Sequence, residues 1–152
     1  MAKTRKYTGF DGIAQNYLAG TERFKNLVIF LNGGKLKNFG SFQVRKIRGT
    51  DKWSVHATAR AIDFGYTNRE DGLTFIDFLV RNAEAFGIEA IHDYMYGEWG
   101  RGWYCNKGEW KVYTKNSIGD GGNWVHVELS PEVAKDAAYV DAVFNCLLKP
   151  AL

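Results

Sequence analysis

The segment Trp124-Val-His-Val-Glu-Leu129 constrains the fold most, because apolar and polar side chains alternate along it. Every second residue from Val125 to Leu129 is aliphatic. Successive side chains of a strand point to opposite faces, so the aliphatic residues would face a core while His126 and Glu128 face the other way. The sequence therefore predicts a strand whose second face carries groups suited to acid–base or metal chemistry.

Other segments show the periodicity of amphipathic helices. Apolar residues at spacings of three and four, closed by glycine, predict helices over 21–31 and 73–86. A shorter helix is expected around 12–19. Ser130 as N-cap, followed by Pro131 at the first helical position, predicts a closing helix that runs to about residue 148.

The remaining periodic segments predict strands. They cover residues 42–47, 61–64 and 88–96, with one more at 110–113 inside a long irregular segment, 97–122. Helices and strands are segregated, which indicates an α+β fold with a small, largely antiparallel sheet flanked by helices. No repeat or linker divides the sequence, so we expect a single domain over 1–152.

Length and composition exclude several classes of protein. A chain of 152 residues can bury roughly 68 to 70% of its unfolded surface, so a metal would serve chemistry rather than folding. The apolar run Leu27 to Leu31 is far shorter than the ~20 residues of a membrane helix. Cys105 and Cys146 form no CxxC pair, which favours reduced thiols. We expect a monomer without a signal peptide, made in the cytoplasm.

The net charge of +3 conceals an uneven distribution, because ten basic but only two acidic residues occur up to Arg48. A basic N-terminal third can contact a polyanion. These residues are spread over several predicted elements, and no RNP, zinc-finger or helix-turn-helix signature accompanies them. A solvated positive face is therefore favoured over a specific nucleic-acid site.

Two of the three histidines have neighbouring residues that are suited to metal binding. His56 and Asp63 flank a stretch of small residues, and His126 lies on the predicted strand beside Glu128. Two imidazoles and one carboxylate leave the fourth position of a tetrahedral zinc site open, as in catalytic zinc sites. His92 has no motif around it and is expected to be structural or solvent-facing.

The segment Ser54-Val-His-Ala-Thr-Ala-Arg-Ala-Ile-Asp63 closely resembles the SxHxxGxAxD motif of a group of zinc peptidases, with Ala59 at the usual glycine. This group comprises D-Ala-D-Ala carboxypeptidases and L-Ala-D-Glu endopeptidases, including many phage endolysins. Asn123-Trp-Val-His-Val-Glu128 resembles the group's second signature, Asp-His-x-His or Asp-x-x-His, in which the last histidine is a zinc ligand. The resemblance spans residues 42 to 130.

The resemblance implies a compact α+β domain of the type shared with hedgehog signalling domains, with zinc held by His56, Asp63 and His126. Arg45 would stabilise negative charge developing on the substrate oxygen. Ser54, the first residue of the motif, is a predicted substrate contact. Independently of the resemblance, aromatic and glycine residues within 97–122 suggest a rim for sugar rings or peptide, and Trp103 is a second predicted substrate contact.

One position departs from the group's pattern, which commonly has a carboxylate three residues before the last ligand as the general base. This chain has Asn123 there, and an amide can orient water but cannot accept its proton. Glu128 or Asp120 would supply the carboxylate, with Glu128 slightly favoured. Glu128 could equally support a ligand by hydrogen bonding. A weakened or lost activity is the remaining alternative.

These observations predict a zinc-dependent peptidoglycan peptidase of the phage-endolysin type. It would hydrolyse an amide bond in the stem peptide of the bacterial cell wall. The alternative is a catalytically weakened, zinc-containing module that binds the cell wall.

Overall fold

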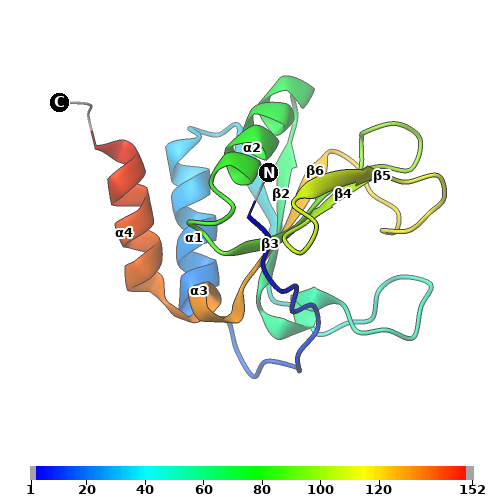
Figure 1. The fold of residues 1–152 in the computed structure, drawn as a ribbon, viewed down its shortest axis with the longest axis horizontal. Coiled ribbons are helices and arrows are strands. Elements are labelled where there is room, and N and C mark those ends of the chain that lie inside the picture. Colours follow the sequence, from blue (N-terminus) through cyan, green and yellow to red (C-terminus); the bar gives the residue numbers. More distant parts are fainter. Residues whose placement is uncertain (1–2, 150–152) are drawn as a thin grey trace.

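The computed structural model describes residues 3–149, which form four α-helices and a six-stranded sheet (Figure 1). The helices are α1 (Ala19–Leu31), α2 (Arg69–Arg81), α3 (Pro131–Lys135) and α4 (Ala137–Leu148), and a 3₁₀ turn, η1, covers Val55–Thr58. The strands are β1 (Leu36–Gly40), β2 (Ala61–Tyr66), β3 (Ile88–Asp93), β4 (Arg101–Tyr104), β5 (Glu109–Val112) and β6 (Trp124–Leu129). Their order in space is β1-β2-β6-β3-β4-β5, and every neighbouring pair is antiparallel. The α+β prediction is therefore confirmed.

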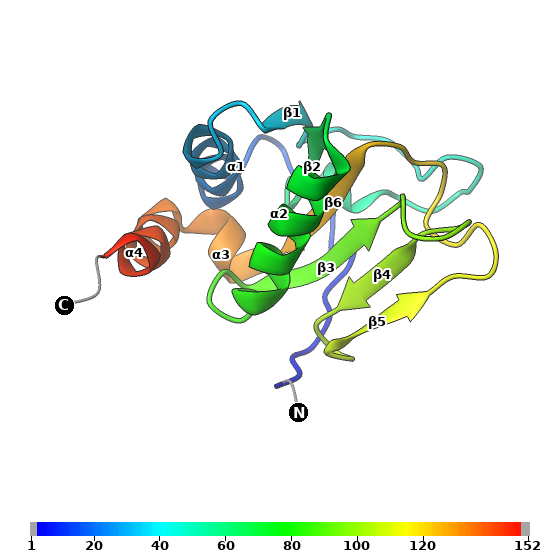
Figure 2. The ribbon, with the colours of Figure 1, turned by 90° about the horizontal axis from the view of Figure 1, so that it is seen from above.

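One face of the sheet is covered by helices. Figure 2 shows α2 over this face, and α1 packs on α3 and α4 beside it. The core between these layers is aromatic and aliphatic, and its fully buried members include Phe24, Phe64, Leu79, Phe86, Val125, Val127 and Leu129. The alternation in β6 thus places its aliphatic residues as predicted.

The opposite face of the sheet is covered by irregular chain. The N-terminal segment, residues 3–14, passes beneath β3 and β6 (Figure 2). Its hydrogen bonds include Arg5 N–H to the carbonyl of Cys105 at 2.9 Å and Ala14 N–H to the carbonyl of Ala57 at 2.9 Å. Within residues 3–149 no α-helix covers this face, and a pocket opens on it.

Several predicted elements differ from the structure. Residues 12–18 are irregular rather than helical, and within them the N–H of Ala14 donates to the carbonyl of Ala57 in η1. Residues 42–47 form only an isolated bridge, Lys46 with Trp53, and the strand in this part of the chain is β1, which was not predicted. The segment 97–122 contains two strands, β4 and β5. The closing helix is interrupted at Asp136, whose side chain caps α4 by accepting from Tyr139 N–H.

Within residues 3–149, none of the helices has both the length and the apolar character needed to cross a membrane.

Candidate metal centre

The register of three neighbouring strands builds the site. Asp63 on β2 is paired with His126 on β6, and His126 is paired on its other side with His92 on β3. Side chains paired across antiparallel strands lie on the same face, so these three project together from the face without helices. The cluster is therefore a direct consequence of strand order.

His56 reaches the cluster from η1, immediately before β2. The hydroxyl of Ser54 caps this turn by accepting from His56 N–H at 3.2 Å. Ala59 ends the turn with a left-handed φ of 61°, a conformation that favours glycine. This explains in physical terms why a glycine suits this position of the motif.

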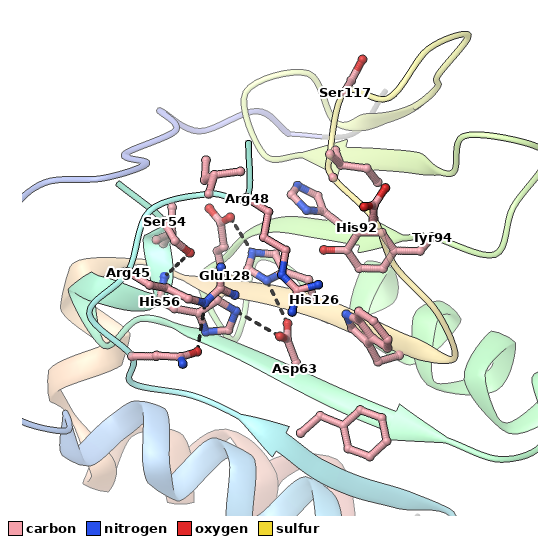
Figure 3. Close-up of a pocket in the computed structure, with 18 of the residues that line it drawn as sticks. Arg45, Arg48, Ser54, His56, Asp63, His92, Tyr94, Ser117, His126 and Glu128 are labelled. Atoms are coloured by element: carbon pink, nitrogen blue, oxygen red, sulfur yellow. Dashed lines mark hydrogen bonds and ion pairs between the residues drawn. The ribbon is translucent and has the colours of Figure 1, made fainter. Parts of the chain in front are cut away.

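The three predicted ligands converge. His56, Asp63 and His126 each offer one ligand atom within 4.8 Å of the others. His56 Nε2 lies 3.2 Å from Asp63 Oδ2, and His126 Nδ1 lies 3.0 Å from Asp63 Oδ1 (Figure 3). Both imidazoles are buried and Asp63 is partly buried. This group can hold a metal ion.

Each imidazole has an outward nitrogen, which points away from Asp63, and an inward nitrogen, which faces it. The partners of the outward nitrogens show which nitrogens are free to bind a metal ion. His56 Nδ1 lies 2.7 Å from the carbonyl oxygen of Ser41, and His126 Nε2 lies 2.8 Å from Glu128 Oε2. A carbonyl or a carboxylate only accepts, so each outward nitrogen carries a hydrogen and each inward nitrogen can present a lone pair to Asp63. Lone pairs that face a carboxylate repel it. The arrangement therefore requires a cation, either a metal ion or a proton on an imidazole.

The pKa values of the acidic groups agree with a site built for positive charge. Burial would raise the pKa of Asp63, but its contacts with the imidazoles of His126 and His56 outweigh burial and hold the pKa well below its usual value. Burial would likewise raise the pKa of Glu128, but its bond to His126 lowers it to about 2. Conversely, burial would lower the pKa of His126, yet Asp63 and Glu128 raise it to about 10. In the metal-free chain, a proton on His126 supplies the cation.

Glu128 makes hydrogen bonds through both carboxylate oxygens. Oε2 accepts from His126, and Oε1 accepts from the hydroxyl of Tyr7 at 2.6 Å. Burial, followed by the charge of Glu128, raises the pKa of Tyr7 far above its usual value, so Tyr7 remains a neutral donor. This is the geometry of a carboxylate that supports a metal ligand, which was one of the two predicted roles of Glu128.

Sequence reasoning did not assign Tyr7 or His92 to the site. His92 lines the pocket, stacks on His126 with ring centroids 4.6 Å apart, and bonds to the hydroxyl of Tyr104 through Nε2 at 2.8 Å. The alternation of residues 88–93 carries a signal for His92, because it places this side chain on the face away from the core. No local signal identifies Tyr7, since its segment lacks regular structure.

The cluster lies in an open pocket of about 570 Å³. Arg45 and Arg48 line one side of the pocket. The loop formed by residues 117–120 lines the opposite side (Figure 3). Arg45 Nε donates to the side chain of Gln43 at 2.9 Å, which holds the guanidinium beside the pocket. Asp120 is exposed, and its Oδ1 accepts from Asn116 at 3.2 Å.

The remaining predicted site residues fall in different places. Ser54 lines the pocket but uses its hydroxyl to cap η1. Asn123 is exposed just before β6 and is not among the residues that line the pocket. Trp103 is only 6% exposed and belongs to the hydrophobic core, so it lies away from the pocket, contrary to its predicted place on a substrate rim. In β4 it is Tyr104, on the other face of the strand, that lines the pocket.

Comparisons of this chain with protein-family models, with curated proteins and with solved structures found no match.

Proposed function

We propose that this protein is a zinc-dependent peptidase that hydrolyses an amide bond in the stem peptide of bacterial peptidoglycan. The observation that carries the proposal is the convergence of His56 Nε2, His126 Nδ1 and Asp63 in an open pocket. Two imidazoles and one carboxylate are a donor set of catalytic zinc sites, which keep one position for water or substrate. The motifs that carry these residues resemble those of the cell-wall peptidases described above, which supports the choice of substrate.

When bound by these residues, zinc would supply Lewis acidity towards a carbonyl oxygen and lower the pKa of a bound water to about 7. The chain itself would contribute positive charge at the pocket rim. Arg45 lines the pocket and is held by Gln43, so it is suited to stabilise negative charge on the substrate carbonyl oxygen. We therefore retain its predicted role as part of the proposal.

A peptidase also needs a group that accepts a proton from water and returns it to the leaving amine. Both oxygens of Glu128 already accept hydrogen bonds, which argues for a supporting role instead. Asp120 lines the same pocket and its carboxylate is exposed, so we assign it the proton-transfer role. Replacing Asp120 by Asn should abolish turnover while the protein still binds zinc, and full activity in D120N would reject this assignment.

The experiment that tests the function is digestion of purified peptidoglycan with zinc-loaded protein. New amino groups should appear, and mass analysis of the released peptides should identify the bond cleaved. The variant His56→Ala, which lacks a ligand, is the matched control and should release none. Absence of release by the wild-type protein from several wall types would reject the peptidase.

A second candidate function is a zinc-containing module that binds the cell wall without cleaving it. Two observations favour this binding module. Asn123 lies outside the pocket, and both carboxylate oxygens of Glu128 already accept hydrogen bonds, so neither residue offers a free base. This candidate predicts that the protein sediments with insoluble peptidoglycan but releases no amino groups. In either case the site of action would be the bacterial cell wall.

A further inference from the structure

The N-terminal segment meets the candidate metal centre at Tyr7. The hydroxyl of Tyr7 donates to Glu128 Oε1 at 2.6 Å, Glu128 Oε2 accepts from His126 Nε2 at 2.8 Å, and His126 Nδ1 lies 3.0 Å from Asp63 Oδ1. These contacts form one continuous chain of polar groups. It begins 121 residues away in sequence from the glutamate and ends at the ligand atoms.

The sheet leaves room for this chain of contacts. On β6, Glu128 is paired with Ala61 on one side and with Ala90 on the other, and both alanines are fully buried. Small side chains at these two positions form a floor on which a large ring from another segment can lie. Tyr7 packs edge-on against Tyr104 here, with ring centroids 5.0 Å apart.

Tyr7 is held in place from both sides along its own segment. Before it, Arg5 N–H donates to the carbonyl of Cys105 at 2.9 Å. After it, Thr8 donates to the carboxylate of Glu89 through both its backbone N–H, at 3.0 Å, and its hydroxyl, at 2.9 Å. The phenol therefore approaches Glu128 from a fixed direction, so little conformational entropy is lost in making the bond.

We propose that Tyr7 is a positioning residue for the metal ligand His126 and that it acts through Glu128. Held by Tyr7, the carboxylate keeps its second oxygen on Nε2–H of His126. This fixes the tautomer that presents Nδ1 to the metal and fixes the ring orientation. Supporting carboxylates of this kind commonly change metal affinity about 10- to 100-fold when removed. The inference rests on the metal site of the proposed function but not on peptidase activity.

The test is a zinc titration of Tyr7→Phe against a competing chelator. Loss of the hydroxyl should raise the zinc dissociation constant about three- to tenfold, and Glu128→Ala should raise it about 10- to 100-fold. Tyr17→Phe is the matched control, because it removes the same hydroxyl from an exposed position and should change the constant less than about twofold. Far-UV circular dichroism verifies that each variant is folded.

A second measurement reports on positioning directly. In long-range ¹H–¹⁵N spectra of the zinc-loaded wild-type protein, His126 should show hydrogen on Nε2, and in Glu128→Ala this signature should weaken or broaden. A zinc affinity of Y7F equal to that of the wild type, or hydrogen on Nδ1 of His126, would overturn the proposal. Tight zinc binding without peptide hydrolysis would reject the peptidase but leave the positioning role intact, whereas a wild-type protein that binds no zinc would reject both.

Discussion

The imidazoles of His92 and His126 are stacked, with ring centroids 4.6 Å apart and planes inclined by 23°. Of these two histidines, His126 belongs to the group that can hold a metal ion and His92 does not. Burial, followed by the charge of His126, lowers the pKa of His92 to about 3, whereas Asp63 and Glu128 raise that of His126 to about 10. Two paired histidines of the metal-free chain therefore differ in charge at neutral pH.

This difference predicts a pH-dependent stability. His92 stays neutral in the folded metal-free protein but gains a proton in the unfolded chain below pH ~6.5. The contribution of neutral His92 to the free energy of unfolding is thus complete above pH ~6.5. It is lost as the pH falls, by at most about 1.4 kcal/mol per pH unit. Urea unfolding of wild type and His92→Gln between pH 7 and 4 should show a shallower slope for the variant. Parallel profiles would contradict the neutral state of His92.

The raised pKa of His126 predicts that zinc binding releases a proton. At pH 7.5 the metal-free His126 is protonated, and zinc must displace that proton from Nδ1. The apparent dissociation constant should therefore rise about tenfold for each unit that the pH falls below 7.5. Calorimetric titrations in two buffers of different ionisation enthalpy should give about one proton released per zinc. Binding heats that do not depend on the buffer would contradict this prediction.

Removal of zinc is expected to leave the fold intact. The core lies on the helix-covered face of the sheet, away from the metal centre, and the metal-free site retains a proton in place of the metal. A chelator should lower Tm, because zinc that binds only the folded chain adds to the free energy of unfolding. This addition is only about 4 kcal/mol at 1,000 times the Kd of zinc, so the fold should survive its loss. The far-UV spectrum and a cooperative transition should persist. A chelated protein with the spectrum of an unfolded chain would show instead that the metal is structural.

The sequence indicates those parts of the site that depend on local pattern. The alternation in 124–129 places His126 and Glu128 on one face, because a strand repeats every two residues. His56 and Asp63 are found through their motif. The prediction for 42–47 failed although this segment also alternates, since Val44 and Ile47 are exposed and neither joins the hydrophobic core.

The other parts of the site depend on contacts between distant segments. His92 joins the cluster only because β6 lies between β2 and β3, and strand order cannot be read from the pattern of any single strand. Tyr7 lies in a segment without regular structure and meets Glu128 across the sheet. The glycine-rich surroundings of Trp103 predict a rim, but those glycines allow the turns around a β4–β5 hairpin whose inner face joins the core.

A last prediction concerns the packing of α1 on α3. Gly20 lies in the first turn of α1, and a Cβ there would stand 1.9 Å from the carbonyl oxygen of Val133 and 2.8 Å from that of Ala134. Alanine normally stabilises a helix relative to glycine by about 1 kcal/mol. Here the obstructing atoms belong to the backbone and cannot rotate away, so Gly20→Ala should lower the free energy of unfolding by about 1–3 kcal/mol.

The matched control is Asn26→Ala, an exposed position of the same helix, where the change should be neutral or slightly stabilising. Both variants should bind zinc with wild-type stoichiometry, because α1 lies on the far side of the sheet from His56 and His126. Urea denaturation measures the two free energies under identical conditions. If G20A proved as stable as N26A, α1 and α3 would have to lie further apart than they do in this structure, since the helices cannot accommodate a methyl group at their present separation.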